Sequence, residues 1–482
     1  MKKLIDKKMP KGGFLRAVSV LVGGTAGSQV VLIATSPILT RLYTPSDFGI
    51  LAVFVSIIGI LGVIASLRYE LAIPLPRNDD RAINVLALSV ISLISLTTLL
   101  SIIIWLFGND FLVLINSPEL GSYLWLLPAA FALMGGYQTL QYWSLRYKDF
   151  GLIAKTKILQ STSTTVLQMA GSVLGPLALI GGRVIGQLLS FIMMLRGSRH
   201  TIISIKANIS AKNIWSVAKE YKQFPLFSSW AGLLNASGAQ IPSLFFAAVY
   251  GPAAAGGYML AQRIINMPLT VIGSAVSDVF LPSSIAANRE NRLASQVQQL
   301  FSALASLIFP GAVLLFFTAP DLFQVVFGND WRIAGEIVSW LAPMLAIQFL
   351  INPISRLFVT VERQGLALVL QASLFLLRGC ALVAAYALDM PLLVAVQFFS
   401  VGSILGYVLY FISINWILDV SFFSIFKEFK ASFLSSILVF LFCLLFYEVL
   451  FDSYVRLMLS ILVGGAIIMI NVFNLAKTIK DV

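Results

Sequence analysis

Long apolar segments recur from end to end of this 482-residue chain, and charged residues cluster in the short gaps between them. Each segment is too long for a buried strand but long enough, at about 20 residues, to cross a hydrocarbon core about 30 Å thick as a helix. Charged residues make up 11% of the chain, against about 25% in soluble domains. The pattern predicts an all-α polytopic membrane protein and excludes soluble enzymes, disulfide scaffolds and disordered chains.

We expect 14 transmembrane helices. Their predicted ranges are 14–40, 48–67, 82–107, 123–145, 158–174, 177–195, 226–249, 256–285, 297–318, 334–360, 366–388, 392–418, 433–451 and 457–475. The first range follows five lysines, as a secretory signal would, but it is about twice as long as the apolar region of such a signal. It is therefore expected to be an uncleaved helix. Gly175 and Pro176 leave almost no turn before the sixth helix.

The lysines and arginines set the orientation. With the amino end inside, 27 of the 33 fall in cytoplasmic segments, three in outer gaps and three within helices. Cytoplasmic segments of membrane proteins carry this excess of basic residues. The net charge of +12 is thus explained by topology rather than by nucleic-acid binding, and both termini are predicted to be cytoplasmic.

Four short motifs occur twice, in the same order. They are Y-x-P-x-x-x-G at 43–49 and 250–256, G-x-Q at 27–29 and 238–240, Leu-Gln at 159–160 and 370–371, and F-G-N-D at 107–110 and 327–330. The copies begin six predicted helices apart, an even number, so they share orientation. We expect two six-helix lobes, 1–195 and 224–418, joined by a cytoplasmic linker at 196–223 and followed by two helices within 419–482. Two lobes about a cleft suit alternating access.

Some segments carry a family resemblance: LYTPSDFG at 42–49, LRYELAIP at 67–74, LAQRI at 260–264 with Pro268, and FGNDW at 327–331. They look like the polysaccharide exporters, the bacterial flippases for lipid-linked O-antigen and related oligosaccharides, in the MOP superfamily that also contains MATE-type multidrug exporters. The resemblance implies a non-enzymatic flippase of the bacterial inner membrane. Its substrate would be an undecaprenyl-pyrophosphate-linked oligosaccharide, moved from the cytoplasmic to the periplasmic leaflet. Many members have 12 helices, whereas the 14 expected here match lipid II flippases.

Arginines lie inside three predicted helices, at Arg183, Arg263 and Arg378. Arginine at mid-helix costs about 2.5 to 3.5 kcal/mol on insertion scales, so such a residue is functional by default. Asp278 is the only carboxylate well inside a predicted span, so we expect these cations to bind an anion such as pyrophosphate. For Arg183, snorkelling to the outer surface is an equal alternative. For Asp278, the alternatives are a proton relay and a charge that reaches the inner interface.

Polar side chains on the first, seventh and fourth predicted helices are candidates to bind sugar hydroxyls: Thr25, Ser28, Gln29, Asn235, Ser237, Gln240, Tyr137, Gln138, Gln141 and Tyr142. Hydrogen bonding between helices is the alternative role. The basic linker contains Ile209, Ile214, Trp215 and Tyr221. That composition fits either a helix lying beside anionic lipid or a solvated connection.

No cofactor or metal is expected. The chain has no G-x-x-x-x-G-K-[ST] phosphate-binding loop, and the lone His200 and the distant Cys380 and Cys443 form no ligand set. A membrane-embedded polysaccharide polymerase or ligase, an ion-coupled multidrug exporter and an assembly scaffold are the alternatives to a flippase. The expected partners are the lipid-linked oligosaccharide, membrane lipids and other polysaccharide-assembly proteins.

Overall fold

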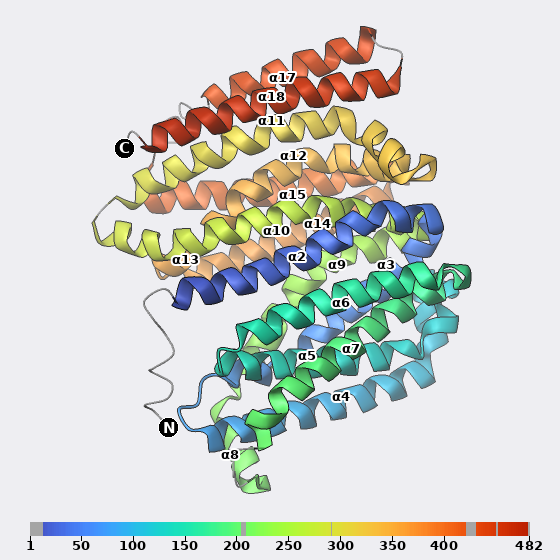
Figure 1. The fold of residues 1–482 in the computed structure, drawn as a ribbon, viewed down its shortest axis with the longest axis vertical. Coiled ribbons are helices and arrows are strands. Elements are labelled where there is room, and N and C mark those ends of the chain that lie inside the picture. Colours follow the sequence, from blue (N-terminus) through green and yellow to red (C-terminus); the bar gives the residue numbers. More distant parts are fainter. Residues whose placement is uncertain (1–12, 204–208, 291, 421–429, 450–451, 481–482) are drawn as a thin grey trace. The chain divides into compact units, whose positions relative to one another are not determined.

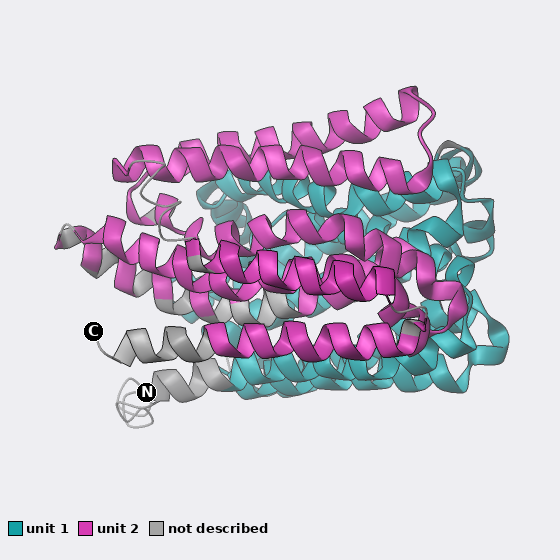
Figure 2. Ribbon diagram, turned by 90° about the horizontal axis from the view of Figure 1, so that it is seen from above, with its two compact units in different colours: residues 1–256 teal, residues 257–482 magenta. Residues whose placement is uncertain are grey.

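The computed structural model describes residues 13–203, 209–290, 292–420, 430–449 and 452–480. Every regular element in these ranges is helical, and Figure 1 labels the helices in chain order. Contacts divide the chain into two compact units, residues 1–256 and 257–482, which Figure 2 shows in different colours. The units defined by contacts and the lobes defined by the repeat differ in two ways: the first unit also contains the linker and the seventh predicted helix, and the second unit also contains the C-terminal segment 419–482. The lobes therefore stay a prediction.

The first unit is built around long helices that pack side by side. They are α2 (Gly13–Leu42), α3 (Pro45–Leu61), α4 (Asp79–Leu114), α5 (Leu126–Arg146), α6 (Phe150–Ala170), α7 (Pro176–Ile203) and α9 (Ser229–Tyr250). Its short elements are α8 (Ala211–Glu220), the 3-10 helices η2 (Gly62–Ile64), η3 (Tyr69–Ala72), η4 (Pro118–Tyr123) and η5 (Ser172–Leu174), and the π-helical turn η6 (Phe224–Ser228). The helix α10 (Pro252–Arg289) begins in this unit and continues into the second.

The second unit continues from α10 with further long helices. They are α11 (Leu293–Phe327), α12 (Arg332–Ile354), α14 (Gln364–Ala387), α15 (Leu392–Leu418), α17 (Lys430–Val449) and α18 (Ser453–Lys480). The short elements η7 (Asn329–Trp331) and α13 (Leu357–Thr360) connect them. α11 packs against α12, α17 and α18, and α14 pairs with α15.

Each predicted span overlaps one long helix over the residues that the structure describes, which confirms the all-α membrane fold. The range 334–360 also continues past the end of α12 into the short α13. Within the described ranges, 11 helices are long and apolar enough to cross a membrane, so the chain is a multi-pass membrane protein. The count of 14 spans stays a prediction. The turn before the sixth predicted helix exists after all, because Gly175 adopts a positive φ of 57° and Pro176 begins α7.

Several helix ends differ from the predicted ranges, for local reasons. α6 begins at Phe150 rather than 158, because the carboxylate of Asp149 accepts a hydrogen bond from the Leu152 N–H at 3.1 Å. This places Lys157, predicted in a cytoplasmic gap, within a helix. α11 continues through Pro320 to Phe327, although its predicted range stopped at 318. Asp321 therefore lies inside a helix, which corrects the expectation that Asp278 is the only intrahelical carboxylate.

The two copies of the Y-x-P-x-x-x-G motif meet in the first unit. A side chain on Gly49 would overlap the backbone carbonyl of Pro252, and one on Gly256 would overlap the carbonyl of Pro45. Each copy thus supplies a glycine that packs on the proline of the other. Both prolines occupy the first position of a helix, where the missing N–H costs nothing. The reciprocal contact brings the starts of α3 and α10 together backbone to backbone.

Candidate functional site

A cavity of about 320 Å³ opens among four helices of the first unit. Its walls are Phe54, Val55, Ile58 and Gly59 of α3, Ala130 and Met134 of α5, Arg183, Val184 and Gln187 of α7, and Gln240 of α9. The volume falls within the range of about 300–1,000 Å³ that is usual for small-molecule sites. Apolar walls with a few convergent polar groups are also typical of such sites, so this cavity is the candidate binding site.

Arg183 is the one charged side chain among these lining residues. It is half-buried on α7 and makes no hydrogen bond or ion pair within the described part of the chain. The guanidinium carries five N–H donors in a fixed fork and no acceptor. A half-buried arginine that has no protein partner is available to pair with an anion that enters the cavity.

Two amides beside Arg183 also offer donors. The Oε1 atom of Gln240 accepts a hydrogen bond from the Ser56 hydroxyl at 3.2 Å, and that of Gln187 accepts one from the side-chain amide of Gln160. Each carbonyl oxygen thus already accepts one hydrogen bond, while the NH₂ groups of Gln240 and Gln187 remain available to donate. The lining thus combines a guanidinium and two amide donors with no carboxylate. This chemistry suits a phosphate or another anion.

A second cation stands close to this cluster in sequence and structure. Lys157 of α6 donates to the Thr25 hydroxyl of α2 at 3.0 Å, and Gln160 follows it one helical turn later. The sequence analysis missed Lys157, Gln160 and Gln187. The spacing of four residues between Arg183 and Gln187, which places both on one helix face, was the available signal.

The structure does not bring every predicted residue to the cavity. Gln29 is half-buried on α2, and Gln141 and Tyr142 lie on α5, but none of the three is among the lining residues. Tyr142 packs instead against an apolar cluster that includes Tyr69 and Trp143. Of the predicted site residues, the cavity brings together Arg183 and Gln240.

In the second unit, neutral groups hold the guanidinium of Arg378. Its Nε donates to the Ser403 hydroxyl at 2.9 Å and one Nη donates to the Tyr407 hydroxyl at 3.2 Å. The guanidinium carbon also lies 5.5 Å from the ring centres of Phe399 and Tyr407. No carboxylate pairs with Arg378 in the described ranges, so its charge is solvated by hydroxyls and aromatic faces.

The other two predicted charges lie on α10. Arg263 is half-buried and follows Gln262, whose amide donates to the Tyr258 hydroxyl at 2.9 Å. Asp278 also belongs to α10, but its side chain lies outside the described residues. Roles for Arg263, Arg378 and Asp278 in binding or coupling stay predictions.

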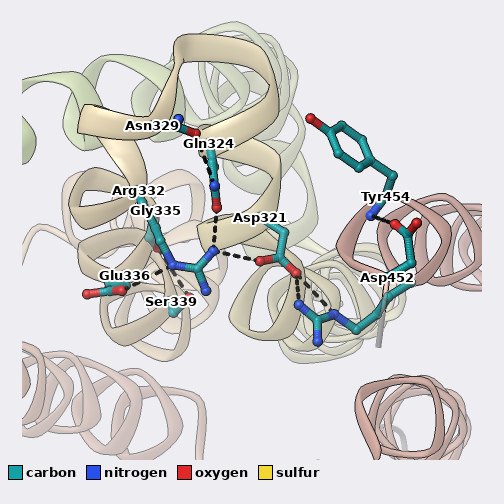
Figure 3. A network of polar contacts seen from close by, with 10 residues as sticks. Asp321, Gln324, Asn329, Arg332, Gly335, Glu336, Ser339, Asp452 and Tyr454 are labelled. Carbon is teal, nitrogen blue, oxygen red and sulfur yellow. Dashed lines mark hydrogen bonds and ion pairs between the residues drawn. The ribbon is translucent and has the colours of Figure 1, made fainter. Parts of the chain in front are cut away.

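A charge cluster that the sequence analysis missed joins three helices of the second unit (Figure 3). Asp321 of α11 is 4% exposed and accepts from Arg332, which begins α12, at 2.9 Å and from Nε of Arg456, on α18, at 3.0 Å. Arg332 also donates to Gln324 at 2.6 Å. From the sequence, Arg332 and Arg456 are two of the three basic residues in outer gaps, and Asp321 was not recognised as their partner. The cluster links α18 to α11 and α12.

Comparison with known proteins identifies the family. The sequence profile described as "Polysaccharide biosynthesis protein" matches residues 38–335, well over half of the chain. Among curated proteins, the succinoglycan biosynthesis transport protein ExoT of Rhizobium meliloti is 22% identical over 66% of this chain and 63% of its own length. The lipopolysaccharide biosynthesis protein WzxC of Escherichia coli is 20% identical over 68% and 65%.

The teichuronic acid biosynthesis protein TuaB of Bacillus subtilis is 28% identical over 35% of both chains. The chain thus spans less than two thirds of the length of these relatives. Among solved structures, the lipid II flippase MurJ in an inward closed conformation aligns over 95% of this chain and 99% of its own, with a TM-score of 0.76 and 15% identity. A MATE protein in complex with MaL6 aligns over 85% and 96%, with a TM-score of 0.57 and 14% identity. The chain belongs to the polysaccharide biosynthesis protein family and has the fold of MurJ and the MATE transporters.

Proposed function

We propose that this protein is a flippase that moves a polyprenyl-pyrophosphate-linked oligosaccharide across the bacterial inner membrane. The observation that carries the proposal is the cavity of the first unit, whose lining contains no carboxylate. Arg183 has no partner in the described part of the chain, and two amides beside it present donors. The names of the relatives support it, because they concern transport or biosynthesis of polysaccharides and flipping of lipid II.

The cavity would hold the head-group end of the lipid. Arg183 would form a bidentate pair with one phosphate, since its fork matches two phosphate oxygens. The NH₂ groups of Gln187 and Gln240 would donate to the second phosphate or to hydroxyls of the first sugar. A volume of about 320 Å³ is too small for the polyprenyl chain, which would stay in the bilayer.

Both termini would be cytoplasmic. At the end of the first unit where α4 begins, Arg146 of α5 pairs with Asp79 of α4 at 2.8 Å. Most basic residues of that unit lie at this end, whereas Arg41 lies at the opposite end. The basic residues at this end are Arg77, Arg81, Arg146, Lys148, Lys155, Arg196, Arg199, Lys212, Lys219 and Lys222. This excess marks the cytoplasmic side of a membrane protein. Alternating access by the two predicted lobes would then carry the head group outward.

A cationic drug is a poor fit to the same cavity. Binding a cation calls for a carboxylate, whereas the described lining offers a guanidinium and amide hydrogens that would repel it. A multidrug exporter with the MATE fold is therefore the weaker proposal. Binding of organic cations at the cavity, lost on replacing Gln240 but not Arg183, would favour it.

The test compares two arginines of the same helix. Arg183→Ala should weaken binding of a short-chain polyprenyl pyrophosphate disaccharide by about 10- to 100-fold, because a charge-assisted hydrogen bond is worth about 1.5 to 3 kcal/mol. Arg183→Lys should lose less, since it keeps the charge but not the fork. Arg199→Ala, at the exposed end of α7, is the matched control and should bind normally.

Binding is measured by calorimetry on purified protein, and export by the return of surface glycan in strains that each lack one defined flippase. A stably folded Arg183→Ala protein with wild-type binding and export would remove this arginine from the site. Equal binding of the disaccharide with and without its pyrophosphate would contradict the anion site itself.

A further inference from the structure

The short helix α8 has two faces of different chemistry. One face docks on the first unit: Val217 is 2% exposed and packs with Ala82 and Leu86 of α4, and Ile214 and Ala218 pack against the same cluster. Lys212, Trp215 and Lys219 occupy the other face, because spacings of three and four residues return to one side of a helix. All three are exposed, Trp215 by 65%. Because Ile214, Val217 and Ala218 pack on the first unit, Lys212, Trp215 and Lys219 point away from it.

The outward face is basic, and within the described ranges no acid forms an ion pair with Lys212 or Lys219. Lys219 lies over the Trp215 ring, 5.5 Å from its centre, so the two side chains form one surface. Glu220 is the single acidic residue between 196 and 230, and it is engaged by Arg81 at 3.3 Å. This surface therefore complements a negatively charged partner.

The chain leads from α8 to exposed aromatic residues at the start of a candidate membrane span. α8 has ten residues and is about 15 Å long, too short to cross a bilayer. It packs on the start of α4 and leads within a few residues to the span Phe224–Tyr250, both apolar enough to cross the membrane. At the beginning of that span Phe227 is 70% and Trp230 is 69% exposed. Tryptophan and lysine together are typical of the membrane–water interface.

We propose that α8 is a binding surface for anionic phospholipid, with Lys212 and Lys219 on the lipid phosphates and Trp215 at the interface. The proposal rests on the orientation given under Proposed function, because anionic headgroups must reach this end of the first unit. It goes beyond that function in assigning a lipid partner that is not the transported substrate. A lysine near an anionic surface contributes about fivefold in affinity, so two should contribute about 25-fold.

The experiment places a reporter on the proposed surface. In full-length protein with Cys380→Ser, which removes the exposed cysteine and leaves Cys443 buried, Ser216→Cys is labelled with an environment-sensitive fluorophore. The detergent-solubilised protein is titrated with phosphatidylglycerol or with phosphatidylcholine. We expect a saturable blue shift with phosphatidylglycerol but not with phosphatidylcholine. The Lys212→Gln/Lys219→Gln double variant should bind phosphatidylglycerol about 25-fold more weakly. Raised salt should also weaken binding to the parent protein.

The matched control is Lys148→Gln/Lys155→Gln, two exposed lysines at the same end of the unit. It should titrate like the parent. Equal responses to both lipids, or equal weakening by the two double variants, would overturn the proposal, since the effect would then not belong to α8. The assay reads lipid binding without transport, so its result is independent of whether Arg183 binds a pyrophosphate.

Discussion

The helix α3 contacts the segment from α9 into α10 in two different ways. At one end, called the closed end, the backbones touch, and further along, at the hollow, the helices line a cavity. At the closed end, Gly49 and Gly256 let the backbones of the two motif copies touch. Further along, Ile58 and Gly59 of α3 and Gln240 of α9 line the cavity that contains Arg183. Backbone therefore packs on backbone at one end, while side chains surround a cavity at the other.

The duplicated motifs relate to these two regions differently. The Y-x-P-x-x-x-G copies form the closed contact together, so both are structurally equivalent there. Gln29 and Gln240 are also repeat partners, yet only Gln240 lines the cavity. The two copies of one motif thus form a symmetric contact, whereas the two glutamines of the other motif occupy different surroundings.

The largest effect is expected from filling the closed end. Gly49→Ala or Gly256→Ala should lower the free energy of unfolding by roughly 3 kcal/mol, because a rigid backbone carbonyl occupies the place of the new methyl group. Gly181→Ala in α7 is the control, since no atom lies within 4 Å of its new methyl group. Thermal unfolding in detergent measures all three. Wild-type stability of both test variants would show that the closed contact is looser than described.

The contact formed by Asp321, Arg332 and Arg456 should lose less stability on substitution than the glycine contact does. Asp321→Asn removes the carboxylate shared by Arg332 and Arg456, and we expect a loss of about 2 kcal/mol, tempered by the solvent that reaches Arg332. Asp330→Asn, an exposed acid nearby, should change stability by less than about 0.5 kcal/mol. Thermal unfolding in detergent measures the stability of both variants. Equal stability of the two variants would mean that the cluster does not hold α18 in place.

The sequence predicted the helices better than it predicted their ends. Apolar runs are enough to locate a span, whereas Asp149 starts α6 through a local hydrogen bond, and Pro320 does not interrupt α11. Proline is tolerated within membrane helices when neighbouring groups satisfy the freed backbone. The predicted range ended at 318, so Asp321 was not recognised as a residue within the helix. Arg183 was found because a charge in an apolar run is conspicuous, but the partners on other helices depend on packing.

At the hollow, a new methyl group should affect binding more than stability. In Gly59→Ala the methyl group would lie 3.1 Å from the Nε2 atom of Gln240, the movable end of a long side chain. Gln240 can shift, so stability should change by less than about 1 kcal/mol. The displaced amide should weaken binding of the pyrophosphate disaccharide by severalfold. A loss of stability equal to that of Gly49→Ala would erase the proposed difference between the two ends.

The smallest effect is expected from Ser56→Ala, which removes a single buried hydroxyl group and its hydrogen bond. The Ser56 hydroxyl holds the carbonyl oxygen of Gln240 at 3.2 Å, so its loss frees that oxygen to face the cavity as an acceptor. Without this bond the side-chain amide of Gln240 can rotate by about 180°, so that its oxygen rather than its NH₂ group faces a bound phosphate. We expect binding to weaken about two- to fivefold, in line with one net hydrogen bond of about 0.5 to 1 kcal/mol. The control is Ser101→Ala on α4, whose hydroxyl bonds only its own helix at Thr97. Tighter binding in Ser56→Ala would mean that the substrate uses Gln240 as an acceptor, and the sugar rather than the phosphate would then occupy this side of the cavity.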